Sequence, residues 1–137
     1  MNYLFLVYGD EQSWDALSSA EREAFTGACL ANHTALRESG HLLSAAELQA
    51  SDTVIMGRLQ QGELLLGGET GVKPGLHLNG FLVIRARDLN EAIRLATLMP
   101  QAQAGAIEVR PILETVWSTD KPAGQDVSSD SSPGSYR

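Results

Sequence analysis

The chain carries one pattern twice, in which an apolar strand leads into a capped helix and then into another strand. The first copy opens with the apolar run of residues 3–8, which Gly9 and Asp10 end. The second copy opens with the run of residues 80–84, before a helix start at Asp88. Two strand–helix–strand units in one short chain predict a two-layer α+β domain, because the helices must bury one face of the sheet.

The first helix has clear signals at both ends. Ser18 and Glu21 have the spacing of a capping box, in which each side chain bonds the other residue's backbone N–H. Gly40 stands where a left-handed cap ends a helix. These signals predict a helix over residues 19–39, and we expect residues 12–17 before it to be a loop that holds Trp14 against the domain.

The second helix and the remaining strands complete the pattern. Asp88 and Glu91 repeat the capping spacing, and Pro100 is expected to end this helix. Alternating or β-branched runs predict further strands at 41–48, 53–59, 63–67, 78–85 and 107–116, with a hairpin connection at 60–62. The order β-α-β-(hairpin)-β-α-β predicts a ferredoxin-like split β-α-β domain with an inserted β-hairpin.

Length and composition predict one folded domain and a tail. The chain has 137 residues, of which 43% are apolar, enough for one core. We assign residues 1–117 to the domain. Residues 118–137 are rich in Ser, Asp, Gly and Pro, so we expect a disordered C-terminal tail.

Charge and cysteine content exclude several classes of protein. The net charge of -7 disfavours nucleic-acid binding and docking on anionic membranes. Cys29 is the single cysteine, so an internal disulfide is impossible and a cytoplasmic location is expected. The apolar run at residues 3–8 is far too short to span a bilayer.

The ordered motifs resemble the YCII-related family, and more closely its DGPF-domain branch. They are Tyr-Gly-Asp-Glu at 8–11, Leu-Arg-Glu-Ser-Gly at 36–40, Gly-Phe-Leu-Val-Ile at 80–84, Asp-Leu-Asn-Glu-Ala at 88–92 and Ile-Glu-Val-Arg-Pro at 107–111. The resemblance implies a dimeric α/β-barrel arrangement, in which two copies pair through their sheets. Most of the family has no assigned reaction. A few relatives are lyases or isomerase-like enzymes on ring-derived acids or chlorinated aromatics, using a His–Asp pair without a cofactor.

Two positions depart from the family pattern. The Asp-Gly-Pro-Phe turn that names the branch is replaced by Gly-Glu-Thr-Gly at 68–71. Met99 stands before Pro100, where the catalytic relatives have their acid. The His–Asp pair therefore does not transfer whole to this chain.

His33 is the candidate catalytic residue. Its distance from Gly40 matches the helix histidine of the enzymatic relatives. On the predicted helix it borders the apolar stripe near Cys29 and Leu36, where a half-buried imidazole can act as a general base. The alternative is a structural side chain that closes the rim of the core. An acid near its ring, from Asp10, Glu47 or Glu69, would favour the catalytic interpretation.

Five further residues are candidates for binding. Tyr8 and Asp10 end the first strand, although Asp10 also suits a turn cap. Glu69 and His77 lie in or beside a glycine-rich segment that suits a ligand-contacting loop or an ordinary exposed one. Arg110 on the last strand suits a substrate carboxylate, or a sheet surface that faces solvent or a second copy in a dimer.

Two functions stay open. The first is a cofactor-free lyase or isomerase that uses His33 as its base on a small ring-derived acid. The second is a non-catalytic module that binds a small ligand or a regulatory partner. The three histidines have no metal-ligand spacing, so neither metal nor cofactor is expected. Both functions are compatible with a homodimer, because helices on one side of a four-stranded sheet leave its other face uncovered.

Overall fold

The computed structural model describes residues 1–50, 54–66 and 75–114. The elements in chain order are β1 (Asn2–Gly9), α1 (Glu11–Asp15), α2 (Ser19–Glu38), β2 (Leu42–Glu47), β3 (Gly57–Gln60), β4 (Glu63–Leu66), β5 (His77–Arg85), α3 (Leu89–Thr97), α4 (Pro100–Ala104) and β6 (Ala106–Pro111). The tail expected over 118–137 lies outside the described residues. Among the described helices, none is long and apolar enough to cross a membrane.

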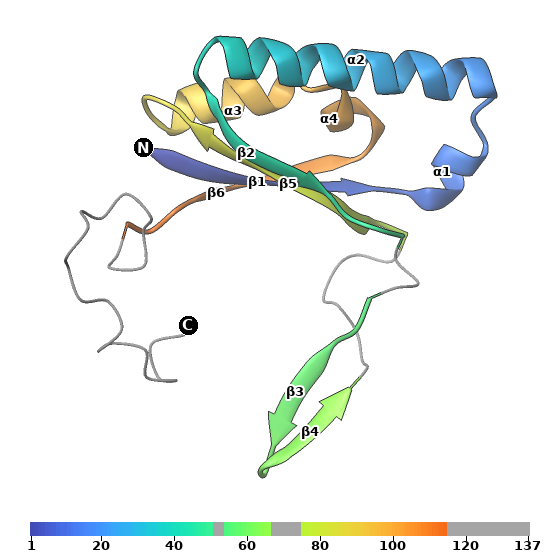
Figure 1. Ribbon diagram of the computed structural model, residues 1–137, viewed down its shortest axis with the longest axis vertical. Helices are drawn as coiled ribbons and strands as arrows, with labels where there is room; N and C mark the ends of the chain where they lie inside the picture. The colour runs from blue at the N-terminus through green and yellow to red at the C-terminus, as the bar shows by residue number, and fades with distance from the viewer. Residues whose placement is uncertain (51–53, 67–74, 115–137) are drawn as a thin grey trace.

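The main sheet has four strands in the order β2-β5-β1-β6, and every neighbouring pair is antiparallel. The first strand of the chain therefore lies inside the sheet, between β5 and β6. All the helices lie on one side of this sheet (Figure 1). This arrangement confirms the predicted ferredoxin-like α+β fold.

The core forms between the sheet and the helices. On β1 the buried side chains alternate, with Tyr3, Phe5 and Val7 facing the helices. Leu82 and Ile84 of β5 continue this layer beside them. The helices contribute Leu36, Ala92, Leu95 and Ala96, and Met99 joins them from the N-cap of α4. The period-2 alternation of the strands thus places one set of apolar residues in the core.

The opposite face of the sheet, called the open face below, is also apolar at its centre. Leu4 and Leu6 of β1 point there, opposite Val83 and Phe81 of β5. These four side chains are half-buried, and no described helix covers them (Figure 1).

Helix α2 begins and ends where the sequence predicts. The Ser18 hydroxyl accepts a hydrogen bond from the backbone N–H of Glu21 at 3.1 Å. The Glu21 carboxylate accepts one from the backbone N–H of Ser18 at 2.9 Å. Gly40 follows the helix with a φ of 82°, a conformation that favours glycine.

Two short helices correct the sequence-based expectations. Residues 11–15, expected as loop, form α1, because the Asp10 carboxylate accepts from the backbone N–H of Gln12 and caps a turn of helix. Trp14 does lie against α2, with its ring 6.1 Å from that of Phe25. Pro100 follows the end of α3 but also begins α4, because proline suits the first turn of a helix.

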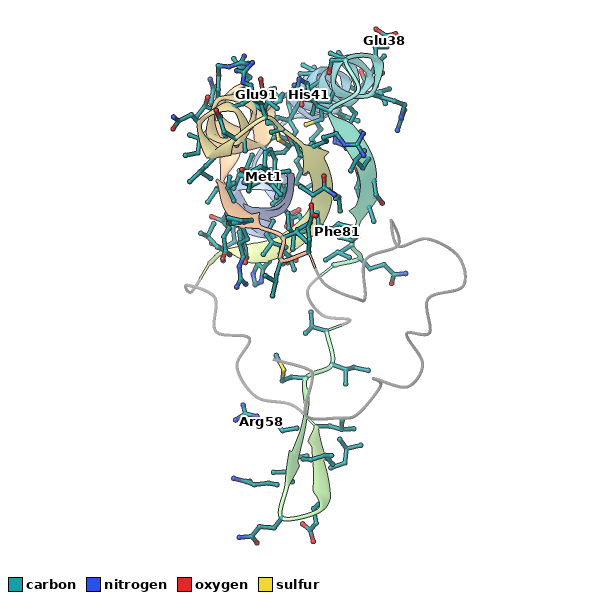
Figure 2. The ribbon with its side chains drawn as sticks, turned by 90° about the vertical axis from the view of Figure 1, so that its left-hand side faces the viewer. Met1, Glu38, His41, Arg58, Phe81 and Glu91 are labelled. Atoms are coloured by element: carbon teal, nitrogen blue, oxygen red, sulfur yellow. The ribbon has the colours of Figure 1, made fainter. Side chains whose placement is uncertain are left out.

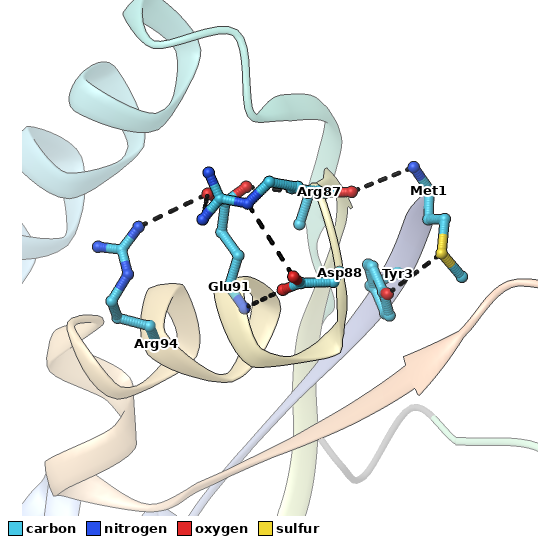
Figure 3. A network of polar contacts seen from close by, with 7 residues as sticks. Met1, Tyr3, Arg87, Asp88, Glu91 and Arg94 are labelled. Carbon is cyan, nitrogen blue, oxygen red and sulfur yellow. Dashed lines mark hydrogen bonds and ion pairs between the residues drawn. The ribbon is translucent and has the colours of Figure 1, made fainter.

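A network of polar contacts fixes the start of α3 (Figure 3). The Glu91 carboxylate accepts from the backbone N–H of Arg87 at 2.9 Å and pairs with the Arg87 guanidinium at 3.1 Å. The Arg94 guanidinium lies 3.8 Å from the same carboxylate. The hydrogen bond from Arg87 is the main reason that the pKa of Glu91 lies below its usual value, and both arginine charges add to the effect.

Strands β3 and β4 form a separate two-stranded hairpin. Gln61 and Gly62 make its turn with φ values of 53° and 80°, as a two-residue hairpin turn requires. Both strands are shorter than the predicted runs at 53–59 and 63–67, parts of which lie outside the described residues. The hairpin extends away from the helices (Figures 1 and 2).

We expect the capping box to stabilise the domain measurably. Replacing Ser18 with alanine removes the acceptor for the Glu21 N–H, so Ser18→Ala should lower the free energy of unfolding by about 1 kcal/mol. Urea denaturation followed by circular dichroism measures this change. Ser19→Ala is the matched control, because Ser19 lies one residue inside the helix; an equal loss in both variants would contradict the cap.

The polar contacts of Glu91 should make the free energy of unfolding depend on pH. Because the folded pKa of Glu91 is lowered, its contribution is present above the unfolded value near 4.5 and is lost as the pH falls through the folded value. Glu91→Gln should therefore destabilise the domain at about pH 7 but much less at about pH 3. Urea denaturation of both proteins at each pH tests this. Glu23→Gln, at an exposed position of α2, should match the wild type at both.

Candidate functional site

The candidate site lies under α2. This helix contacts β2 and α4 in the described structure. At 100° per residue, buried Leu36 marks the centre of its inner face, with Cys29 and His33 toward one side and Asn32 toward the other. The helix thus places a thiol, an imidazole and an amide along the same buried boundary.

His33 is half-buried, and its Nε2 atom is inaccessible to solvent. This nitrogen has no hydrogen-bond partner among the described residues. A buried polar atom without a partner carries a desolvation cost, so such an atom marks a place where a ligand or a water can bind.

Two amide oxygens are in the same buried, unpartnered state as His33 Nε2. Oδ1 of Asn32 on α2 and Oε1 of Gln101 on α4 are also buried without a partner among the described residues. Both belong to helices that contact each other. Amide oxygens only accept hydrogen bonds, so groups that satisfy them must be donors such as hydroxyls or water. Sequence reasoning missed Gln101, because the proximity of α4 to α2 arises only in the folded chain.

The acid of the catalytic relatives has no replacement at position 99. Met99 is 1% exposed and packs into the core. Asp10 is occupied at α1, where its carboxylate also accepts from the Ser13 hydroxyl at 3.0 Å. Glu69 lies outside the described residues. Of the described acids, none hydrogen bonds to His33.

Of the candidate acids that the structure describes, Glu47 is the one whose charge acts on a residue of α2. It lies on β2, at a position that faces α2, and its charge acts on Cys29, one helical turn before His33. Burial, and then the Glu47 charge, raise the pKa of the Cys29 thiol above its usual value. Cys29 therefore stays protonated at neutral pH and is poorly suited to act as a nucleophile.

Tyr8 and Arg110 meet elsewhere, on the open face of the sheet. The Tyr8 hydroxyl donates to the Glu108 carboxylate at 2.9 Å, and Arg110 Nε lies 3.9 Å from that carboxylate. Burial and the contact with Glu108 raise the pKa of Tyr8. Glu108 was not among the predicted site residues, although its alternation with Arg110 along the last strand was a usable signal.

The predicted site residues that the structure describes therefore lie in separate places. His33 lies in the helix layer, whereas Tyr8 and Arg110 lie on the open face. His77 begins β5, opposite Gly9. Among the described residues, no group of three or more histidine, cysteine or acidic side chains is placed to hold a metal ion.

Two shallow hollows occur away from these residues. One has a volume of about 390 Å³ and is lined by side chains of α3, α4 and β6, including Ile93 and Ile107. The other has the same volume, about 390 Å³, and includes His41 and Glu91 between the end of α2 and the start of α3. Figure 2 shows these two residues facing each other between the helices. Neither hollow includes a residue that the sequence singled out for binding or catalysis.

Comparison with known proteins identifies the family. The model of the YCII-related domain matches residues 1–116. The chain belongs to the YCII-related family. No curated protein matches this YCII-related chain.

A solved structure is similar to this YCII-related protein. It is 5-chloro-2-hydroxyhydroquinone dehydrochlorinase (TftG) from Burkholderia phenoliruptrix AC1100, in complex with 2,5-dihydroxybenzoquinone. It is 17% identical, with a TM-score of 0.50, over 84% of this chain and 96% of the other. A likeness at this level of identity supports the fold.

We expect Glu47 to control the reactivity of Cys29. Glu47→Gln removes a negative charge near the thiol, so the pKa of Cys29 should fall and its alkylation by iodoacetamide at about pH 8 should become about two- to fivefold faster. The rate is measured by mass spectrometry of the intact protein. Glu38→Gln on the exposed end of α2 should leave the rate unchanged. Equal rates in wild type and Glu47→Gln would place Glu47 too far from the site to matter.

Proposed function

We propose that this YCII-related protein is a cofactor-free lyase or isomerase that acts on a small ring-derived acid, with His33 as the proton-transfer base. The observation that carries the proposal is the buried Nε2 of His33, which has no hydrogen-bond partner within the part of the chain that the structure describes. In its neutral form an imidazole has a lone pair on one ring nitrogen, which can accept a proton. A base at this position is ready to accept a proton from a bound substrate.

The neighbouring amides suit a hydroxylated substrate. The buried oxygens of Asn32 and Gln101 accept hydrogen bonds, and substrate hydroxyl groups are donors. In an isomerisation, His33 would take a proton from one ring position and return it to another. In an elimination, it would take the proton while the electrons of the broken bond form a double bond and a leaving group departs with its own electron pair.

The lack of a described acid at His33 has a consequence for this mechanism. Because no carboxylate of the described residues bonds to the ring, none of them supplies a fixed counter-charge to the imidazolium that forms. The developing negative charge of the substrate, or the more distant Glu47, would have to stabilise it. We therefore propose an acidic substrate, such as a phenol or an enol, whose proton leaves readily.

The structural neighbour supports a choice of test compounds. Its name describes loss of hydrogen chloride from 5-chloro-2-hydroxyhydroquinone, and its structure holds 2,5-dihydroxybenzoquinone. Hydroxylated and chlorinated hydroquinones, together with ring-derived lactones and acids, form a reasonable first panel for this protein.

A second candidate is a non-catalytic binding module in the cytoplasm. The buried Met99 in place of the acid favours it. The linked polar groups of Tyr8, Glu108 and Arg110 offer an alternative contact on the open face. This module would keep the fold and bind a small ligand or a regulatory protein without turnover.

For either function we propose a homodimer that pairs the open faces of two sheets. The half-buried Leu4, Leu6, Phe81 and Val83 are aligned across β1 and β5. An apolar sheet face of this kind gains stability from a partner that excludes water, and two-fold symmetry is the commonest way for one chain to provide it.

The test separates binding from turnover. In His33→Gln, kcat toward any panel compound that the wild type converts should fall about 10²- to 10⁴-fold, because general base catalysis is lost. The Kd of 2,5-dihydroxybenzoquinone, measured by calorimetry, should change little. His41→Gln is the matched control and should retain full kcat, since His41 comes eight residues after His33 and its Nδ1 lies 2.9 Å from the carbonyl oxygen of Arg85.

Each result assigns the protein to one function. Retained kcat in His33→Gln would exclude His33 as the base. Binding of a panel compound by the wild type without any turnover would favour the non-catalytic module. Circular dichroism must show that both variants fold like the wild type.

A further inference from the structure

The β3–β4 hairpin exposes more large apolar side chains than a free surface element should. Leu59 is 75% exposed, Leu64 is 63% exposed and Leu66 is 67% exposed. Together with Gly57 they lie on one face of the hairpin, because Leu59 pairs with Leu64 and Gly57 pairs with Leu66. We call these four residues the leucine face.

The other face of the hairpin is mainly polar. Arg58, Gln60 and Glu63 lie there with Leu65, which is 42% exposed. The hairpin therefore has the alternation of a strand pair with one side for water and one side for a core. A position for a Cβ atom on Gly57 would lie 3.5 Å from Leu66 Cδ2 and 3.6 Å from Leu64 Cδ1, so the leucines cluster over the glycine.

No described part of the same chain covers the leucine face. Isolated two-stranded hairpins are marginally stable in water, and they gain stability when an apolar face is packed. Exposed apolar patches of this type mark interaction surfaces. The hairpin thus has the alternating sequence pattern of an element that is half-buried in the functional protein.

The position of the hairpin indicates what covers it. The helices lie on one side of the main sheet, and the hairpin projects on the other side, beyond the open face (Figure 1). Phe81 of the open face points to the same side (Figure 2). A second copy docked on the open face would therefore meet the hairpin.

We propose that the leucine face packs against a second copy of this chain and extends the sheet-to-sheet interface. This inference rests on the homodimer proposed above. Four strands about 4.8 Å apart and on average about 25 Å long give a footprint of roughly 500 Å². A stable interface buries about 800 Å² on each partner, so the sheet alone is small and the two hairpins supply additional area.

Two-fold symmetry makes the contact reciprocal. Each chain gives its hairpin to its partner and receives the partner's hairpin in return. The leucine face would turn toward the partner, and Arg58, Gln60 and Glu63 would stay in water. The same element then contributes twice to one dimer.

A matched pair of leucines tests the inference. Leu64 and Leu65 are neighbours in β4 but lie on opposite faces. Leu64→Thr should raise the dimer dissociation constant about tenfold or more, measured by analytical ultracentrifugation over a range of concentrations. Leu65→Thr should leave it within about twofold, because the same change then falls on the water-facing side.

A second measurement locates the contact directly. A photo-crosslinking residue in place of Leu59, in a mixture of isotopically heavy and light chains, should give crosslinks between heavy and light copies that map to the open face. A wild type that is monomeric at every concentration would overturn the proposal, as would crosslinks found only within one chain. Equal dissociation constants for Leu64→Thr and wild type would also overturn it.

The hairpin contact and the sheet dimer are separable. Phe81→Ser removes a side chain of the open face and should weaken the dimer whether or not the hairpin takes part. A dimer that Phe81→Ser weakens and Leu64→Thr leaves intact would retain the proposed dimer and exclude the hairpin from it. The kcat of His33→Gln relative to the wild type tests His33 independently of both.

Discussion

The position of β1 inside the sheet is the constraint on which the rest of the structure depends. Because β5 and β6 hydrogen bond to its two edges, residues 3–8 of β1 are fixed in register on both sides. The alternation of its side chains then determines which residues face the helices and which lie on the open face. Tyr3, Phe5 and Val7 anchor the helices, and the residues between them make the open face apolar. A shift of one residue would exchange these two sets and expose the core.

Most of the fold follows from local signals that agree with one another. The capping residues of α2 and α3 and the alternation of β1 all act over a few residues, so they can be read from the sequence. The two short helices were missed because each depends on one local signal that also fits another structure. One turn of helix at residues 11–15 depends on a single cap at Asp10, and Pro100 both stops one helix and permits the next.

The candidate site was harder to predict, because its members come from separate elements. Helical spacing placed His33 beside Cys29, but only the packed structure brings α4 and β2 to this helix. Only the packed structure shows that the side-chain oxygens of Asn32 and Gln101 are buried. From their places in the chain, Tyr8 and Arg110 were separate candidates for binding. The pleat directs both to the face away from His33, where Glu108 links them.

The insertion of the hairpin has a consequence for how such chains diversify. Strands β2 and β5 are hydrogen-bonded antiparallel neighbours, so a tight turn would be enough to join them. The chain instead leaves β2 and returns to β5 through residues 48–76. That stretch can lengthen, shorten or change sequence without altering the register of the main sheet. Related chains are therefore free to acquire new assembly partners at this point while the β1-centred scaffold stays constant.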